Sequence, residues 1–158
     1  GRTGTAGALG SIPIPDGHGG SQQLIEAASV HVLERKLTKA GIDPRPLWYS
    51  ADDWVDFGEP LQEWIESTAR ALAYAIVSSA AVIDFGAAII DGGFPAWVRK
   101  RVVEATRNSM LEMDQRGVII PEILEGQVGS NARAIGGASL PLFSRYLLDF
   151  NSFLKETA

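Results

Sequence analysis

A long helical pattern over residues 59–83 constrains the fold more than any other feature of the sequence. Apolar and small residues recur there at spacings of three and four, which places them on one face of an α-helix. These residues are Leu61, Trp64, Ile65, Thr68, Leu72, Ile76, Ser79 and Ile83. The second half of the segment is rich in alanine, and small side chains allow neighbouring backbones to come close. The pattern therefore predicts one long helix whose second half is buried on more than one side.

Shorter patterns predict several further helices. Leu33 and Leu37 share a helical face, and Gly41 follows as a stop signal. Ser50 is the expected N-cap of a short helix, and Pro95 suits the first position of another, where its missing N–H costs nothing. The expected helices cover residues 22–28, 30–40, 51–57 and 95–114, with a last one from about residue 130.

Strand candidates are few. They are residues 11–14, the apolar run 87–90 and an extended segment over 118–124. The two prolines within 43–50 favour a turn. A buried strand, a Gly-Gly turn and a helix in succession are typical of α/β proteins. The sequence thus predicts an α/β fold in which a few strands are covered by several helices.

Composition excludes several classes of function. The formal net charge is −5, which argues against a self-sufficient nucleic-acid-binding protein, because phosphate contacts need clustered basic side chains. The absence of cysteine removes disulfides and thiolate metal sites. The longest apolar stretch, 71–83, is shorter than the roughly 20 residues that span a bilayer. No signal peptide is visible, so we expect a cytoplasmic protein that contacts no membrane.

A glycine pair marks the first candidate binding site. Gly92 and Gly93 lie between the expected strand 87–90 and the helix that begins at Pro95. Their backbone amides could hold a nucleotide phosphate or a sugar against the N-terminus of that helix. A tight strand-to-helix turn is the alternative, and one glycine pair lacks the specificity of a complete phosphate loop.

Two further glycine motifs lie near the end of the chain. Gly126 and Gly129 could form a second edge of a nucleotide cleft, or they could allow close helix packing. Gly136 and Gly137 fall inside the last expected helix, where each costs roughly 1 kcal/mol. Their presence predicts a close backbone approach at that point.

The remaining polar candidates fit solvated surfaces better than catalytic sites. His18 and His31 are too few to bind zinc without cysteine. No Ser-His-Asp arrangement is discernible from the spacing. Two charged groups are both expected to be solvated. The acidic cluster consists of Asp52, Asp53, Asp56 and Glu59. The basic helix face consists of Arg99, Lys100, Arg101 and Arg107.

Four blocks in the chain resemble motifs of the ROK family (repressor, open reading frame, kinase), in family order and with family spacing. The blocks are 4–11 (GTAGALGS), 24–29 (LIEAAS), 90–93 (IDGG) and 129–138 (GSNARAIGGA). The opening residues, Leu47-Trp48 and the segment 91–95 (DGGFP) look most like proteobacterial sugar-responsive transcriptional regulators of that family.

The resemblance implies a two-lobed fold of the actin-like, ribonuclease-H-like ATPase type, with sugar and ATP between the lobes. Residues 1–158 match only the C-terminal lobe. We expect the N-terminal lobe, the first hairpin of the C-terminal lobe and any helix-turn-helix to lie upstream, which would explain the glycine-rich opening. The family's catalytic aspartate and first phosphate loop belong to that upstream part, so no catalytic residue is assigned here.

Departures from the family pattern concern the sugar and zinc positions. The family's sugar-binding glutamate and its sugar- and zinc-binding histidine correspond to Ala8 and Ser11, which cannot replace a charged acceptor or a metal ligand. Glu26 is the candidate for the third sugar-contacting carboxylate. The family's three-cysteine zinc loop would fall between Pro15 and Leu24, where this chain has no cysteine. We therefore expect no zinc. The resemblance places Gly92, Gly93 and Gly136 in the nucleotide cleft.

The sequence therefore favours the effector-sensing and dimerisation lobe of a ROK-type transcriptional regulator. A carbohydrate would be its effector, the protein would form a homodimer or tetramer, and DNA would be bound only through an upstream domain. The alternative is the C-terminal half of an ATP-dependent ROK sugar kinase, and only that alternative would require ATP. A third interpretation is a purely structural dimerisation lobe that binds no sugar.

Overall fold

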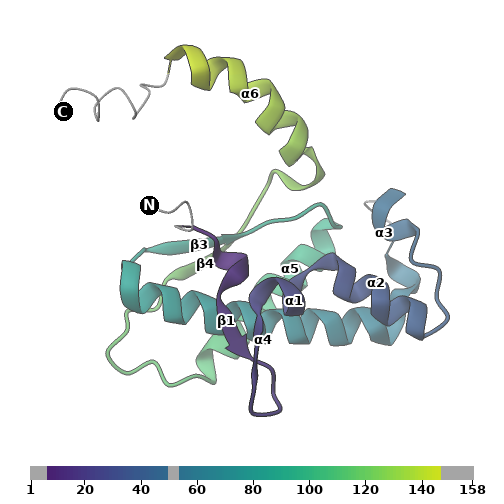
Figure 1. Cartoon of the computed structure of the whole chain (residues 1–158), viewed down its shortest axis with the longest axis horizontal. Coiled ribbons are helices and arrows are strands. Elements are labelled where there is room, and N and C mark those ends of the chain that lie inside the picture. The colour runs from purple at the N-terminus through teal and green to yellow at the C-terminus, as the bar shows by residue number, and fades with distance from the viewer. Residues whose placement is uncertain (1–6, 50–53, 147–158) are drawn as a thin grey trace.

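A computed structural model describes residues 7–49 and 54–146 of the chain. Its centre is the long helix α4 (Gly58–Ile83), and α5 (Ala96–Leu111) packs along it. Helices α1 (Leu24–Ala28) and α2 (Val30–Lys39) also pack against α4 (Figure 1). The expected long helix is confirmed, and so is the helix expected at 30–40, whereas the one expected over 22–28 begins two residues late, at Leu24.

The alanine-rich half of α4 is buried as its sequence predicts. Ala69, Ala73 and Ala75 are fully buried, and Ala71 is 5% exposed. Ala71 and Ala75 pack in a small cluster with Ile14 and Leu24, whereas Ala73 belongs to the main core. The small side chains thus allow α4 to contact different elements on different sides. The helix ends at Asp84, whose backbone is left-handed with a φ of 54°.

The main core lies around α4 and is closed by aromatic side chains. Leu33 and Leu37 of α2 are both fully buried, so the predicted apolar face of that helix is confirmed. Trp64 of α4 packs edge-on against Phe94, and its indole N–H donates to the Ser29 carbonyl at 3.0 Å. That bond fixes the junction between α1 and α2 on α4.

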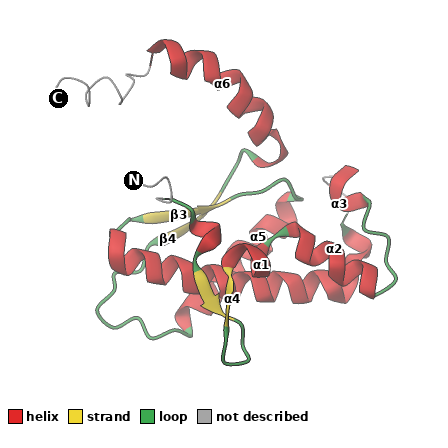
Figure 2. Ribbon diagram, viewed as in Figure 1, coloured by secondary structure: helices red, strands yellow, loops and turns green. Residues whose placement is uncertain are grey.

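The strands form two separate two-stranded sheets (Figure 2). Strands β1 (Pro13–Pro15) and β2 (Ser21–Gln23) are antiparallel, with Ile14 opposite Gln22. Strands β3 (Ala87–Ile90) and β4 (Glu122–Glu125) are parallel. The described part of the chain is therefore mixed α/β and rich in helix.

Several expected boundaries are wrong. Residues 11–14 do not form a strand from their start, because Leu9–Ser11 is a 3₁₀ turn, η1, and β1 begins two residues later. The sequence predicts no strand at residues 21–23, where β2 forms, and it places residues 22 and 23 in the helix expected over 22–28. The extended segment 118–124 is a strand only as β4, which begins at residue 122. Local pattern cannot show such short strands, because pairing with a distant segment defines them.

Two expected helices also differ from the prediction. The proline-containing turn at 43–50 includes a short helix, α3 (Pro46–Tyr49). Pro95 is the N-cap of α5 and not its first residue, and α5 ends at Leu111, three residues early. The predicted cap at Ser50 lies outside the described residues, and the part of helix 51–57 that the structure describes is the 3₁₀ turn η2 (Val55–Phe57).

The last helix, α6 (Ala132–Tyr146), follows a 3₁₀ turn, η3 (Gly129–Asn131), and projects away from the other elements (Figure 1). A Cβ added at Gly136 or Gly137 would meet no atom within 4 Å. Within the described residues, the close backbone approach predicted for this glycine pair is therefore wrong. No helix among the described residues is long and apolar enough to cross a membrane.

Candidate ligand-binding cleft

The carboxyl ends of β3 and β4 meet at one edge of their sheet. Because the two strands are parallel, the loops that follow them leave from the same side: residues 91–93 after β3, and residues 126–129 after β4. In open α/β sheets, ligands bind beyond the carboxyl ends of the strands. This edge brings together Gly92, Gly93 and the Gly126/Gly129 motif, and it is the candidate cleft.

Asp91 joins the two loops at this edge. Its carboxylate accepts hydrogen bonds from the backbone N–H groups of Gly92 at 2.8 Å, Val128 at 3.0 Å and Gly129 at 3.1 Å. A carboxylate has up to four acceptor positions, so one side chain can satisfy all three donors. Asp91 thereby holds the loop after β4 against the loop after β3.

Arg99 of α5 adds the positive charge of the site. Its guanidinium lies 3.5 Å from the Asp91 carboxylate and 3.1 Å from that of Glu125 at the end of β4. The Arg99 side chain is only 12% exposed, so its assignment to a solvated basic face is wrong. The guanidinium of Arg107 is likewise engaged, since it donates to the Ile123 carbonyl. Lys100 fits the expectation, with a side chain that is 69% exposed.

These contacts set the charge state of Asp91. Partial burial of the carboxyl acts to raise its pKa, but the N–H donors of Gly129, Gly92 and Val128 and the charge of Arg99 outweigh that effect. The pKa of Asp91 therefore lies below the usual value for aspartate. The group is a stable anion at neutral pH.

The glycines of the two loops differ in what they permit. A Cβ at Gly126 would overlap the Asp91 side chain, and one at Gly92 would overlap the Phe94 ring. At Gly93 an added Cβ would lie 3.7 Å from the Ser130 Cα, which is ordinary contact. Gly129 has a φ of +56°, a conformation that favours glycine. Close packing within the protein thus accounts for Gly92 and Gly126, and backbone conformation accounts for Gly129.

Of the first two sugar-motif positions, Ala8 is the N-cap of η1 and Ser11 is its last residue. Both are exposed, and the Ser11 N–H donates to the Ala8 carbonyl at 3.0 Å. An apolar hollow of about 230 Å³ lies between η1, α4 and β3, and its lining includes Leu9 and Asp91. The motif loop and the end of β3 therefore border one hollow, although the side chain that lines it from the motif is Leu9.

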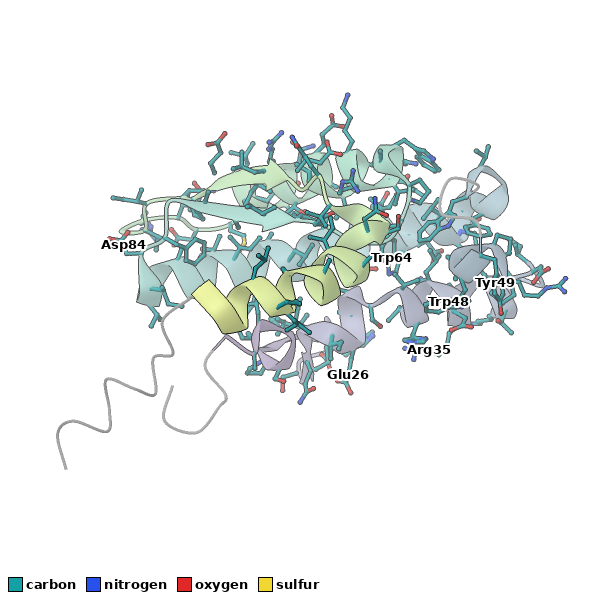
Figure 3. The ribbon with its side chains drawn as sticks, turned by 90° about the horizontal axis from the view of Figure 1, so that it is seen from above. Glu26, Arg35, Trp48, Tyr49, Trp64 and Asp84 are labelled. Atoms are coloured by element: carbon teal, nitrogen blue, oxygen red, sulfur yellow. The ribbon has the colours of Figure 1, made fainter. Side chains whose placement is uncertain are left out.

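Glu26, the third sugar-motif residue, has a structural partner. Its carboxylate accepts the backbone N–H of Gln23 at 3.0 Å and so completes a capping box at the start of α1. Glu26 also lines a larger groove of about 660 Å³ between the β1–β2 hairpin and helices α2, α4 and α5. Figure 3 shows Glu26 at the edge of the molecule. Neither Ala8 nor Ser11 lines that groove, so the structure does not gather the three positions in one pocket.

The histidines have local partners. The hairpin loop between β1 and β2 is closed by Asp16, which accepts the backbone N–H groups of His18 at 2.8 Å and Gly20 at 2.9 Å. His31 contacts Glu34 through Nδ1 at 3.0 Å, and its ring packs at a tilt against that of Trp48, with the ring centres 5.0 Å apart. Among residues 7–49 and 54–146, no three His, Asp or Glu side chains are grouped as metal ligands would be. Asp52 and Asp53 of the expected acidic cluster lie outside the described residues.

One residue of the cleft was not singled out from the sequence. Asp91 belongs to the IDGG and DGGFP segments, which assign it no role, yet it makes more polar contacts at this edge than either glycine after it. A signal existed in its position: a carboxylate placed directly after a buried strand lies at the ligand-binding edge of a parallel sheet. Its partners, 37 and 38 residues further along the chain, could not be read from spacing.

Comparison with known proteins identifies the class of fold. No protein-family model and no curated protein sequence matches the chain. Among solved structures, the chain is similar to a ROK hexokinase from Thermus thermophilus, with a TM-score of 0.58 and 24% sequence identity over 87% of this chain. The chain spans about half of that protein, since the match covers 48% of it. The fold is therefore that of part of a ROK hexokinase, which agrees with the family resemblance of the sequence at the level of fold.

Proposed function

We propose that this chain is the effector-sensing and dimerisation lobe of a ROK-type transcriptional regulator, of partial ribonuclease-H-like fold, with a carbohydrate as its effector. The parent protein would be cytoplasmic, would form a homodimer or tetramer, and would bind DNA only through a domain upstream of this lobe. Effector binding would change the geometry of the DNA-binding dimer, which requires different affinities for the carbohydrate in its two states.

One observation carries this proposal: the fold of a sugar kinase is combined with side chains that suit catalysis poorly. Ala8 and Ser11 stand at the positions that correspond to a charged sugar ligand and a metal ligand in the family. Neither a methyl nor a hydroxymethyl group offers a charge-assisted acceptor.

A sugar-kinase half is the second candidate, and the likeness to a ROK hexokinase favours it. That protein phosphorylates a hexose according to its name, and this chain shares its fold over 87% of the sequence. In this alternative ATP would bind beside Gly92 and Gly93, and upstream residues would supply catalysis.

Titration of the purified protein with a panel of monosaccharides distinguishes the candidates. We expect at least one sugar to bind by calorimetry without sugar-dependent ADP formation from Mg·ATP, and to release the parent protein, which includes the upstream domain, from genomic DNA fragments. Glu26→Gln should weaken sugar binding about tenfold through loss of a charge-assisted hydrogen bond. Glu104→Gln, an exposed site on α5, is the matched control. Sugar-dependent ADP formation would establish the kinase, and no sugar binding would leave a structural lobe.

A further inference from the structure

The edge of the β3–β4 sheet has the parts of an anion-binding site, and a side chain of the protein fills it. Backbone N–H groups of Val128 and Gly129 point at one position, and the Arg99 guanidinium lies beside it. Consecutive amides with an arginine are typical of phosphate-binding sites. Here the Asp91 carboxylate takes these donors, at 3.0, 3.1 and 3.5 Å.

We propose that Asp91 is a built-in anion that excludes phosphate groups from this edge and leaves the cleft selective for uncharged ligands. The inference rests on the proposed function, because it explains how a kinase-like fold could respond to a sugar without binding the phosphates of a nucleotide. Asp91 would thus determine the specificity of the cleft for uncharged ligands over phosphates.

The first argument is that the two backbone donors at this position already have an acceptor. The Val128 and Gly129 N–H groups each point at Asp91, and Arg99 divides its charge between Asp91 and Glu125. A phosphate would have to compete with an acceptor that is tethered to the protein and costs no translational entropy to bind. If phosphate displaced Asp91, the carboxylate would lose these hydrogen bonds at a partly buried site, which costs free energy.

The second argument is electrostatic. Two carboxylates, Asp91 and Glu125, face the single guanidinium of Arg99, so these three groups carry a net negative charge. This net negative charge repels a phosphate that approaches within a few ångströms. Because the site is partly buried, water and salt screen that repulsion only weakly.

The third argument is that Asp91 cannot readily swing aside. Its Cβ and Cγ pack so closely on Gly126 that an added Cβ there would overlap them. The backbone N–H of Gly126 also donates to the Ile90 carbonyl at 2.8 Å, which fixes the loop next to Asp91. The carboxylate is therefore part of the resting architecture of the cleft.

The test is titration of ¹⁵N-labelled protein with inorganic phosphate, and separately with Mg·ATP, monitored at the amide signals of Val128 and Gly129. In Asp91→Ala we expect phosphate to move both signals and to bind about tenfold or more tightly than to wild type, as one regained charge-assisted hydrogen bond would give. Arg99→Gln added to that variant should abolish the gain. Asp91→Asn, which keeps one acceptor oxygen, should give a smaller gain.

Asp114→Ala is the matched control. Asp114 also accepts a backbone N–H and pairs with an arginine, Arg116, but it lies on an exposed turn. Equal phosphate gains in Asp114→Ala and Asp91→Ala would reduce the effect to net charge and overturn the proposal, as would no gain in Asp91→Ala. If the variants fail to fold, wild type still decides: phosphate must leave its Val128 and Gly129 signals unmoved. Sugar titration of wild type tests the proposed function independently of either result.

Discussion

At the residue scale, the hydrogen bonds of Asp91 should contribute measurably to stability. Asp91→Asn keeps the volume of the side chain but removes its charge, and we expect it to lower the free energy of unfolding by about 1–2 kcal/mol at pH 7. The folded pKa of Asp91 lies below its ordinary value of 3.8, so the contribution is complete above that value and is lost as the pH falls through the lowered folded pKa.

Urea denaturation over a pH series measures this dependence. The difference between wild type and Asp91→Asn should stay constant from neutral pH down to about pH 5 and should shrink toward zero in acid. Asp114→Asn is the control, because its ion pair with Arg116 is exposed and such pairs contribute little. A difference that grows in acid would contradict the assigned direction.

The packing of Gly126 against Asp91 yields a second prediction at this scale. Gly126→Ala would place its Cβ inside the Asp91 side chain, and we expect a loss of about 1–3 kcal/mol in unfolding free energy, as for other overpacked sites. Gly86→Ala is the matched control, since a Cβ at Gly86 meets nothing within 4 Å. Thermal denaturation compares the two variants. Equal midpoints would show that the loop after β4 can shift to accommodate the added Cβ, and would contradict the prediction.

The glycines also show the limit of sequence reasoning at a site. Spacing predicts that Gly92, Gly93 and Gly126 lie in loops, but it does not reveal which of them tolerates a side chain. Contacts with Asp91 and Phe94 decide that, and they restrict Gly126 and Gly92 while leaving ordinary contact at Gly93. Gly92 and Gly126 therefore carry a stronger packing constraint than Gly93.

At the element scale, helices were more predictable than strands for a physical reason. The pattern of α4 lies within one continuous segment, so its face and its extent are visible in the sequence. Strand β2 has three residues and exists because Gln22 pairs with Ile14 across a tight hairpin. Similarly, α3 forms despite the two prolines of its segment because Leu47 is buried in the main core. Tertiary contacts override local preference in both cases.

The β1–β2 hairpin yields a prediction about zinc. Its loop is closed by hydrogen bonds from the His18 and Gly20 N–H groups to Asp16, so it has an ordering device other than a metal. Hydroxyl and amide side chains are poor zinc ligands, and Ser11 and Gln22 offer nothing better. We expect elemental analysis of protein purified without a histidine tag or added metal to find negligible zinc. About one zinc per chain would contradict this and require ligands outside the described residues.

At the scale of the whole molecule, small side chains suited to close packing make α4 and α6 the two candidate helices for self-association. Ala69, Ala73 and Ala75 of α4 are fully buried within the chain, so that stripe is already covered. Helix α6 keeps an exposed apolar stripe, because Ile135 and Leu142, seven residues apart on one helical face, are 55% and 60% exposed. The proposed homodimer therefore has a candidate contact surface on α6.

We expect sedimentation of the protein at micromolar concentration to show a dimer or tetramer, and Ile135→Lys to shift it toward monomer. A buried lysine opposite an apolar partner surface loses hydration without gaining a counter-charge, so about tenfold weaker association is expected. Val82→Lys is the control, because Val82 is 85% exposed at the far end of α4. A wild-type protein that is strictly monomeric would refute the proposed dimer. Equal association of Ile135→Lys and Val82→Lys would show that the interface does not lie on α6. Since Ile135 contacts no core cluster, an unchanged thermal midpoint in Ile135→Lys would separate lost association from lost folding.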